Sequence, residues 1–237
     1  MTDQLAQRRE SDPVGGSLPL VSLESVSLGY DSAPVVQAVD LAIYPGDLIG
    51  FAGPNGSGKT TILRAILGLL PVLDGKLSRS CALSDFGYVP QSTALDPQFP
   101  LNVEEVVEMG AYGRVRSYQL LPHDEKERRR EVLDQVGLNH LAGKSFFSLS
   151  GGQKQRILIA RALMVKPKIM ILDEPLSGVD RDSQRAITEL LIRLNRKKGL
   201  AIFFSSHDLD MVRSVAAKIL RVEKGKTWWE ERGGPLP

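Results

Sequence analysis

The sequence has a single cysteine, little net charge and no long hydrophobic run. Cys81 cannot form a disulfide within the chain, which fits a reducing compartment. The 30 Lys and Arg residues against 28 Asp and Glu leave a net charge of +2, whereas a nucleic-acid binder usually carries a marked basic excess. No apolar run approaches the ~20 residues of a membrane-spanning helix, and the polar N-terminus lacks the apolar core of a secretory signal. We therefore expect a cytoplasmic protein without a nucleic-acid partner, which reaches a membrane only through another protein.

The chain is expected to form one α/β domain behind a flexible tail. Residues 1–18 are polar and are predicted to be the tail, and residues 19–237 to be a single domain. Apolar and polar residues alternate over 20–30 and 34–44. This is the pattern of half-buried strands, and the turn residues between the two runs predict an antiparallel pair.

The next part of the chain predicts a nucleotide-binding core. Residues 47–53 form an apolar strand ahead of a glycine-rich loop, and residues 61–70 have helical apolar spacing. A strand over 85–91 precedes a helical insertion at about 92–165, whose first helix carries a near capping box at Asn102. The remaining predicted elements are helices at 124–138, 150–164 and 183–199, strands at 168–173 and 200–206, and a hairpin at 217–230. The predicted fold is thus an α/β core of the nucleotide-binding type, with an antiparallel β-subdomain and a helical lobe.

The loop after the third strand fits the phosphate-binding pattern G-x-x-x-x-G-K-[ST] without a mismatch. Its glycines let successive backbone N–H groups point at phosphate oxygens, and the following helix adds the positive end of its dipole. Lys59 would reach the β- and γ-phosphates of ATP, and the Thr60 hydroxyl would bind Mg²⁺. The alternative is a glycine-rich turn without a ligand. The residues expected to bind nucleotide are Gly53, Pro54, Asn55, Gly56, Ser57, Gly58, Lys59, Thr60 and Thr61.

Two acids follow the apolar run at residues 169–172. Ligands of a parallel sheet bind where the strands end. Asp173 is therefore expected to hold Mg²⁺, directly or through water, and Glu174 to act as the general base that polarises the attacking water. The sequence Asp-Glu-Pro is also typical of turns, so the pair alone is as consistent with a structural turn as with a catalytic site. The phosphate loop earlier in the chain favours the catalytic interpretation.

Residues 149–153, Leu-Ser-Gly-Gly-Gln, resemble the signature motif of the ATP-binding cassette (ABC) proteins. Four other segments resemble motifs of that family in order and approximate spacing, and the resemblance covers about residues 20–230. These segments are Tyr30, similar to the aromatic residue that stacks on adenine; Gln91, similar to the Q-loop glutamine; Ser177–Asp180, similar to the D-loop; and His207, similar to the switch histidine.

The resemblance implies an ABC ATPase fold and a head-to-tail dimer. In such a dimer the signature motif of one copy binds the γ-phosphate of an ATP on the other copy, so that two ATP molecules are buried at a two-fold interface. The signature residues of this chain are Ser150, Gly151, Gly152 and Gln153. Ser150 can also accept hydrogen bonds as the N-cap of its helix.

The resemblance also implies roles for single residues outside the signature motif. Gln91 would belong to the catalytic set and to the Mg²⁺ site. His207 would donate to the γ-phosphate and help hold Glu174. Asp180 would belong to the nucleotide-binding set and help align the active site of the opposite copy. Each single residue has a structural alternative: core packing for Tyr30, an ordinary loop position for Gln91, and a structural histidine for His207.

One cassette without a membrane span favours an ATPase subunit that docks on a separate integral-membrane permease, at the cytoplasmic face of the membrane. Residues 87–114 and 176–180 resemble the manganese- and zinc-type importer ATPases, which implies a divalent metal cargo and a substrate-binding protein in the complete system. Residues 92–118 are expected to line the groove for a coupling helix of the permease. Residues 76–84 depart from that group, because they lack its usual glycine turn.

Two alternatives to metal import stay open. The cargo could be a siderophore, haem, lipid or drug, or the protein could be a non-hydrolysing ABC regulator. The presence of Lys59, Glu174 and His207 disfavours the regulator. The charged run at residues 128–130 is interpreted as a solvated helix face rather than a nucleic-acid site.

Overall fold

The structure of the chain, a computed structural model, describes residues 18–31, 33–91, 95–96, 98–113 and 121–230. The predicted tail up to residue 17 and parts of the predicted coupling groove lie outside these residues. The strands are β1 (Val21–Tyr30), β2 (Ala33–Ile43), β3 (Leu48–Ala52), β4 (Asp74–Arg79), β5 (Phe86–Val89), β6 (Ile169–Leu172), β7 (Ala201–Ser206), β8 (Lys218–Glu223) and β9 (Lys226–Glu230). The α-helices are α1 (Lys59–Ile66), α2 (Val103–Glu108), α3 (His123–Gln135), α4 (Gly151–Met164), α5 (Arg181–Lys198) and α6 (Leu209–Val215). None of these helices in the described ranges is long and apolar enough to cross a membrane.

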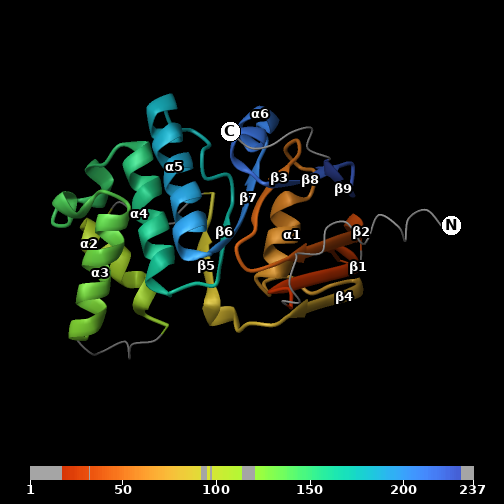
Figure 1. Cartoon of the computed structure of the whole chain (residues 1–237), viewed down its shortest axis with the longest axis horizontal. Helices are drawn as coiled ribbons and strands as arrows, with labels where there is room; N and C mark the ends of the chain where they lie inside the picture. Colours follow the sequence, from red (N-terminus) through yellow and green to blue (C-terminus); the bar gives the residue numbers. More distant parts are fainter. Residues whose placement is uncertain (1–17, 32, 92–94, 97, 114–120, 231–237) are drawn as a thin grey trace.

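Two sheets form the body of the molecule (Figure 1). The first is antiparallel, with the order β2-β1-β4, which confirms the predicted antiparallel opening. The second has the order β5-β6-β7-β3-β8-β9 and is parallel except for β9, which pairs antiparallel with β8. The antiparallel sheet lies at one end of the molecule and helices α2, α3 and α4 lie at the other, with the six-stranded sheet between them.

The strand that leads into the phosphate loop lies inside the larger sheet. All five residues of β3 are buried, because β7 and β8 pair with its two edges, and helices and the antiparallel sheet cover its faces. A continuous apolar run is typical of a parallel strand buried on both faces. The site at its C-terminal end therefore rests on a rigid support.

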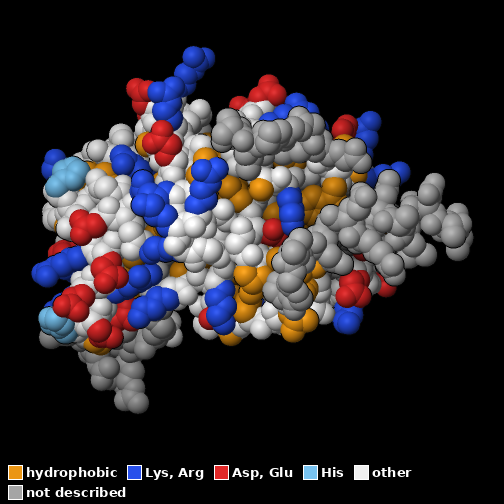
Figure 2. All heavy atoms as spheres, in the orientation of Figure 1, with side chains coloured by type: hydrophobic (Ala, Val, Ile, Leu, Met, Phe, Trp, Pro, Cys, Tyr) orange, Lys and Arg blue, Asp and Glu red, His pale blue; other side chains and the backbone are white. Residues whose placement is uncertain are grey.

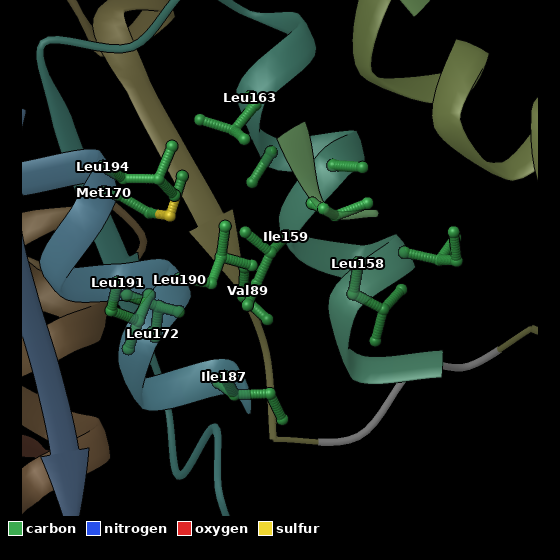
Figure 3. Close-up of a cluster of buried hydrophobic side chains, with 14 of the residues drawn as sticks. Val89, Leu158, Ile159, Leu163, Met170, Leu172, Ile187, Leu190, Leu191 and Leu194 are labelled. Atoms are coloured by element: carbon green, nitrogen blue, oxygen red, sulfur yellow. The ribbon is translucent and has the colours of Figure 1, made fainter. Parts of the chain in front are cut away.

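Side chains of α4 and α5 pack against strands β5 and β6, at one edge of this sheet (Figure 3). In α5 the buried residues recur at i, i+3, i+4 and i+7, which is the spacing of a helix with one apolar face. The helix ends at Gly199, whose φ of 60° confirms the predicted stop. The residues labelled in this cluster are Val89, Leu158, Ile159, Leu163, Met170, Leu172, Ile187, Leu190, Leu191 and Leu194.

The predicted capping box at the start of the helical lobe is confirmed. Asn102 Oδ1 accepts from the backbone N–H of Glu105 at 2.9 Å, and Glu105 Oε2 accepts from the N–H of Asn102 at 2.8 Å. Between this point and the end of α4, the described residues contain helices and one isolated bridge, Asn102 to Ser145, but no strand.

The interpretation of residues 128–130 as a solvated face is wrong for two of the three. Arg129 forms an ion pair with Glu104 of α2 at 3.0 Å, and Arg128 donates to a backbone carbonyl of α4 at 2.8 Å. These guanidinium groups hold α3 against its two neighbours, and only Arg130 is exposed. On the face shown in Figure 2, acidic and basic side chains are interspersed over this lobe.

Helix α1 is shorter than predicted. The apolar spacing predicts a helix to residue 70, but α1 ends at Ile66 and its C-cap is Leu67. Gly68 has a φ of 74°, a left-handed conformation that stops a helix.

The sequence patterns predict neither β4 nor α6. Strand β4 lies at the edge of the antiparallel sheet with half of its residues exposed, so it lacks the alternation that marks a half-buried strand. Helix α6 begins after Asp208, whose Oδ1 accepts from the N–H of Met211 at 3.0 Å. An aspartate N-cap followed by apolar residues at Val212 and Val215 is the signal that would have predicted it.

Candidate functional site

The backbone of the phosphate loop, residues 53–58, changes direction at its glycines. Gly56 and Gly58 have φ values of 77° and 105°, in the left-handed region that favours glycine. A Cβ at Gly53 would lie 2.9 Å from Ser57 Oγ, so the loop has no room for a side chain there. Ser57 Oγ is buried and has no hydrogen-bond partner among the described residues. A bound anion would supply that partner.

Lys59 connects the loop with the acid pair. It opens α1, whose N-cap Gly58 makes no side-chain hydrogen bond, so N–H groups of the first turn remain available to an anion. The buried Lys59 Nζ donates to the carbonyl oxygens of Gly53 at 2.8 Å and Pro54 at 3.2 Å, and it lies 3.3 Å from Glu174 Oε1. The ammonium group therefore lies between the loop and the carboxylate expected to act as the base.

Asp173 and Thr60 are in contact, although 113 residues separate them in the sequence. Thr60 Oγ1 donates to Asp173 Oδ2 at 3.1 Å, and Asp173 is buried. Hydroxyl and carboxylate oxygens are ligands that Mg²⁺ prefers, usually together with several waters and substrate phosphates. The pair therefore has the donor chemistry that the predicted Mg²⁺ site requires.

Glu174 and His207 form the next part of the site. Glu174 Oε2 lies 2.7 Å from His207 Nδ1, the carboxylate is buried, and 51% of the histidine side chain is exposed. With Nδ1 held by the carboxylate, Nε2 is the ring nitrogen left to face a ligand. A cleft of about 150 Å³ opens beside both residues. Its lining residues are Glu174, Leu176, Ser177, Gly178, Gln184, Ser206, His207, Asp208 and Met211.

The sequence patterns do not predict one polar residue of this site, Ser205. Its hydroxyl donates to Asp173 Oδ1 at 2.6 Å and accepts from the backbone N–H of Glu174 at 2.9 Å. The signal that would have found it is a pair of serines at the end of an otherwise apolar strand, because a buried hydroxyl needs hydrogen-bond partners.

The signature residues lie at the start of α4. Ser150 Oγ accepts from the N–H of Gln153 at 3.3 Å, and Gln153 Oε1 accepts from the N–H of Ser150 at 3.0 Å. The predicted N-cap role of Ser150 is confirmed by this capping box. A Cβ at Gly152 would overlap the side chain of Ser183 in α5. Gly152 is therefore also required by helix packing, a role that the sequence reasoning missed.

Asp180 has a local role as the N-cap of α5. Its carboxylate accepts from the N–H of Ser183 at 2.9 Å and from the Ser183 hydroxyl at 2.7 Å. The hydrogen bond from the Ser183 backbone has the larger effect and that from its hydroxyl the smaller one, and together they hold the pKa of Asp180 below its ordinary value. A Cβ at Gly151 would lie 3.6 Å from Val179, so the signature motif and the 177–180 segment form one surface at the start of α4 and α5.

Two further predicted residues lie at strand ends. Tyr30 ends β1 with 43% of its surface exposed, and its hydroxyl accepts from Arg64 Nη1 of α1 at 3.1 Å. Gln91 is exposed and lies two residues beyond β5, whose Val89 pairs with Leu172 of β6. Gln91 and the acid pair thus follow neighbouring strands at the same edge of the sheet.

A larger cavity, of about 380 Å³, lies elsewhere, between the end of α3 and helices α4 and α5. Arg156 and Arg193 line it, and they donate to the carbonyl oxygens of Val136 at 3.2 Å and Gln135 at 2.7 Å. Both guanidinium groups thus cap the end of α3. None of the residues that line this cavity belongs to the phosphate loop or the acid pair, so the chemistry places the candidate site at the smaller cleft.

The family model for "ABC transporter" matches residues 36–177 of the chain. Among curated proteins, the zinc import ATP-binding protein ZnuC of Marinobacter nauticus is 37% identical over 202 residues, which cover 85% of this chain and 74% of that protein. The manganese transport system ATP-binding protein MntB of Bacillus subtilis is 39% identical over 194 residues, which cover 80% of this chain and 77% of that protein.

Solved structures agree with these matches. A transporter described as being of the metal-chelate ABC type, in an inward-facing conformation, superposes with a TM-score of 0.83 at 31% identity, covering 90% of this chain and 83% of that one. A dimeric structure of the ATP-binding cassette MJ0796, bound to ADP and phosphate, superposes with a TM-score of 0.77 at 28% identity, covering 90% of this chain and 100% of that one.

Proposed function

Because this chain belongs to the ABC transporter family, we propose that it is the ATP-hydrolysing subunit of a transporter that imports a divalent metal ion, zinc or manganese. One observation carries the hydrolysis: the phosphate loop, the Thr60–Asp173 pair and the Glu174–His207 pair meet at one edge of the parallel sheet. A non-hydrolysing regulator has no need of a carboxylate held in place by a histidine. The cargo is supported by relatives whose names specify zinc import and manganese transport.

The chain's own residues would share the chemistry of hydrolysis. The N–H groups of the phosphate loop and Lys59 bind the β- and γ-phosphates through charge-assisted hydrogen bonds. Glu174 accepts the proton of the attacking water as general base. His207 orients that carboxylate through Nδ1, which leaves Nε2 to face the γ-phosphate.

Thr60 and Asp173 would hold Mg²⁺, with Gln91 as a further ligand from the neighbouring strand end. The ion, when bound, supplies electrostatic stabilisation of the charge on the phosphates. Tyr30 would stack on the adenine ring, and Thr61 would complete the contacts at the start of α1.

We also propose that two copies bind two ATP molecules head to tail. The phosphate loop lies where β6 and β7 end, since the Gly53 N–H donates to the Ser206 carbonyl and Thr60 donates to Asp173. Ser150 and Asp180 instead cap the starts of α4 and α5, and Gly151 lies beside Val179. In a closed dimer, two such separate surfaces complete each other reciprocally across a two-fold axis. The dimeric cassette MJ0796 with ADP and phosphate supports this arrangement.

The proposed partners are an integral-membrane permease and a substrate-binding protein. The dimer docks on the cytoplasmic face of the permease, and the substrate-binding protein delivers the metal. The coupling helix of the permease would bind along residues 92–118. In the described part of that segment, Phe99 is 64% exposed and Tyr112 is 57% exposed. Exposed aromatic side chains of this kind are typical anchors at protein interfaces.

Uptake of radioactive zinc and manganese tests the proposed cargo. A strain that lacks this gene should take up one of the two ions more slowly at limiting concentration, and the wild-type gene should restore uptake. Glu174→Gln, expressed at the same level, should not restore it, because the chain would bind ATP without hydrolysing it. Normal zinc and manganese uptake in the deletion strain would contradict the proposed metal cargo. A loss of siderophore, haem, lipid or drug transport in that strain would identify the cargo instead.

Phe99→Glu tests the docking surface. The variant should fold and bind ATP normally, because Phe99 is exposed, but a charge on an apolar contact should reduce co-purification with the permease. Leu18→Glu is the matched control, since Leu18 is 78% exposed and lies outside the proposed groove. Loss of ATP binding in Phe99→Glu, measured by fluorescence titration, would place Phe99 in the fold rather than in the interface.

A further inference from the structure

Ser205 carries a buried hydroxyl in a strand that is otherwise apolar up to that point. Residues 201–204 of β7 are Ala, Ile, Phe and Phe, all buried, and the exposed fraction of Ser205 is 0%. A hydroxyl removed from water is unfavourable unless it is hydrogen-bonded. Its partners therefore indicate why a polar side chain is present at this position.

Both partners of Ser205 belong to the acid pair. The hydroxyl donates to Asp173 Oδ1 at 2.6 Å and accepts from the Glu174 backbone N–H at 2.9 Å. Strand β7 lies between β6 and β3 in the sheet, and β6 ends at Leu172, which pairs with Phe204. Ser205 thus lies beside the point where β6 ends and the two acids begin.

We propose that Ser205 is a positioning residue for ATP hydrolysis. It orients the Asp173 carboxylate for Mg²⁺, and it holds the Glu174 backbone so that the Glu174 carboxylate can act as the base. This inference rests on the proposed ATPase function and adds a residue to it. Ser205 touches neither nucleotide nor metal in this role and acts only through the two acids.

The first effect is on the orientation of Asp173. Its Oδ1 is held by Ser205, which leaves Oδ2 facing Thr60 Oγ1 at 3.1 Å. Rotation about the last side-chain bond of an aspartate is broad and roughly two-fold, so a hydrogen bond to one oxygen fixes the plane of the carboxylate and directs the other oxygen towards the metal. Hydrogen-bond partners of metal ligands commonly orient them in this way.

The second effect is on the backbone of Glu174. Its φ of 49° places a non-glycine residue in the left-handed region, which is unfavourable unless the surroundings hold it there. The Ser205 hydroxyl accepts the N–H of this residue and so helps stabilise the turn. That turn directs the Glu174 side chain towards Lys59 and His207.

The test compares Ser205→Thr with Ser205→Val. These variants have nearly the same branched shape at a buried position, and valine has a methyl group where threonine keeps the hydroxyl, so their difference reports mainly the hydrogen bonds. The primary readout is Mn²⁺ affinity in the presence of ATP, followed by electron paramagnetic resonance, because Mn²⁺ shares the oxygen ligands and octahedral geometry of Mg²⁺. The kcat, the KM for ATP and the melting temperature are measured on the same proteins.

Relative to Ser205→Thr, Ser205→Val should bind Mn²⁺ about 10- to 100-fold more weakly and lose kcat by a similar factor, the usual effect of removing a partner of a metal ligand. The KM for ATP should change little, because the phosphate loop is intact. Ser205→Ala should resemble Ser205→Val.

Two results would overturn the proposal in distinguishable ways. Equal Mn²⁺ affinity and kcat in the threonine and valine variants, with an active wild type, would mean that Ser205 only fills space. A wild-type protein that neither binds Mn²⁺ with ATP nor hydrolyses ATP would overturn the ATPase function, and the positioning role with it.

Discussion

Glu174→Gln should bind ATP normally and hydrolyse it about 10²–10⁴-fold more slowly, the usual size of general-base catalysis. The amide has nearly the same shape as the carboxylate but cannot accept the proton of the attacking water. Lys59, Thr60 and Asp173 are unchanged in this variant, so nucleotide binding should survive. Single-turnover hydrolysis and a fluorescence titration with an ATP analogue measure the two properties separately.

The same variant should dimerise with ATP and Mg²⁺ and remain monomeric with ADP. ATP that is bound at the interface but not hydrolysed shifts the equilibrium by mass action toward the dimer. Light scattering on gel-filtered protein measures this. Adding Ser150→Arg should abolish the dimer, because a long side chain would fill the place of the γ-phosphate at the start of α4. Ser84→Arg is the matched control, since Ser84 is exposed and lies in neither of the two surfaces.

One outcome would contradict the shared site. If ATP-bound Glu174→Gln protein stays monomeric at high concentration, both alone and with the permease present, the signature motif does not complete the site of a second copy. Dimerisation only in the presence of the permease would mean that the membrane subunit brings the two copies together.

Lys59→Ala should reduce ATP affinity by about 100-fold or more. Hydrogen bonds to charged groups are worth about 1.5–3 kcal/mol each, Lys59 is expected to make two of them, and about 1.4 kcal/mol corresponds to a factor of ten. Hydrolysis should fall with binding, while circular dichroism should show an unchanged fold. A fluorescence titration at fixed Mg²⁺ gives the affinity.

Lys197→Ala provides the control for lost positive charge. Lys197 lies exposed in the last turn of α5, away from the phosphate loop, and its removal should leave ATP affinity unchanged. Equal affinities for ATP in Lys59→Ala and the wild type would refute the assignment of the phosphate loop and Lys59 as the ATP-binding segment.

Features that depend on neighbours in the sequence could be predicted well. The turn at Gly56 and Gly58, the capping box at Asn102 and the stop at Gly199 each need only the residues within four positions. The order of apolar strands and amphipathic helices likewise indicated an α/β core with an antiparallel sheet. The local patterns were weakest at the edge strand β4, whose exposed residues carry no alternation.

The sequence by itself indicated the phosphate loop, the acid pair and the helix caps at Asn102, Ser150 and Gly199, because their chemistry is contained in short segments. Only the tertiary structure decided which distant groups meet: Thr60 with Asp173, Ser205 with both acids, and Gly152 with Ser183. These contacts join residues from different strands and helices, and they exist only after the parallel strands have aligned their ends and α4 has packed on α5. A serine in an apolar strand or a glycine in a helix has no partner that the local sequence can show, so its role follows from packing alone.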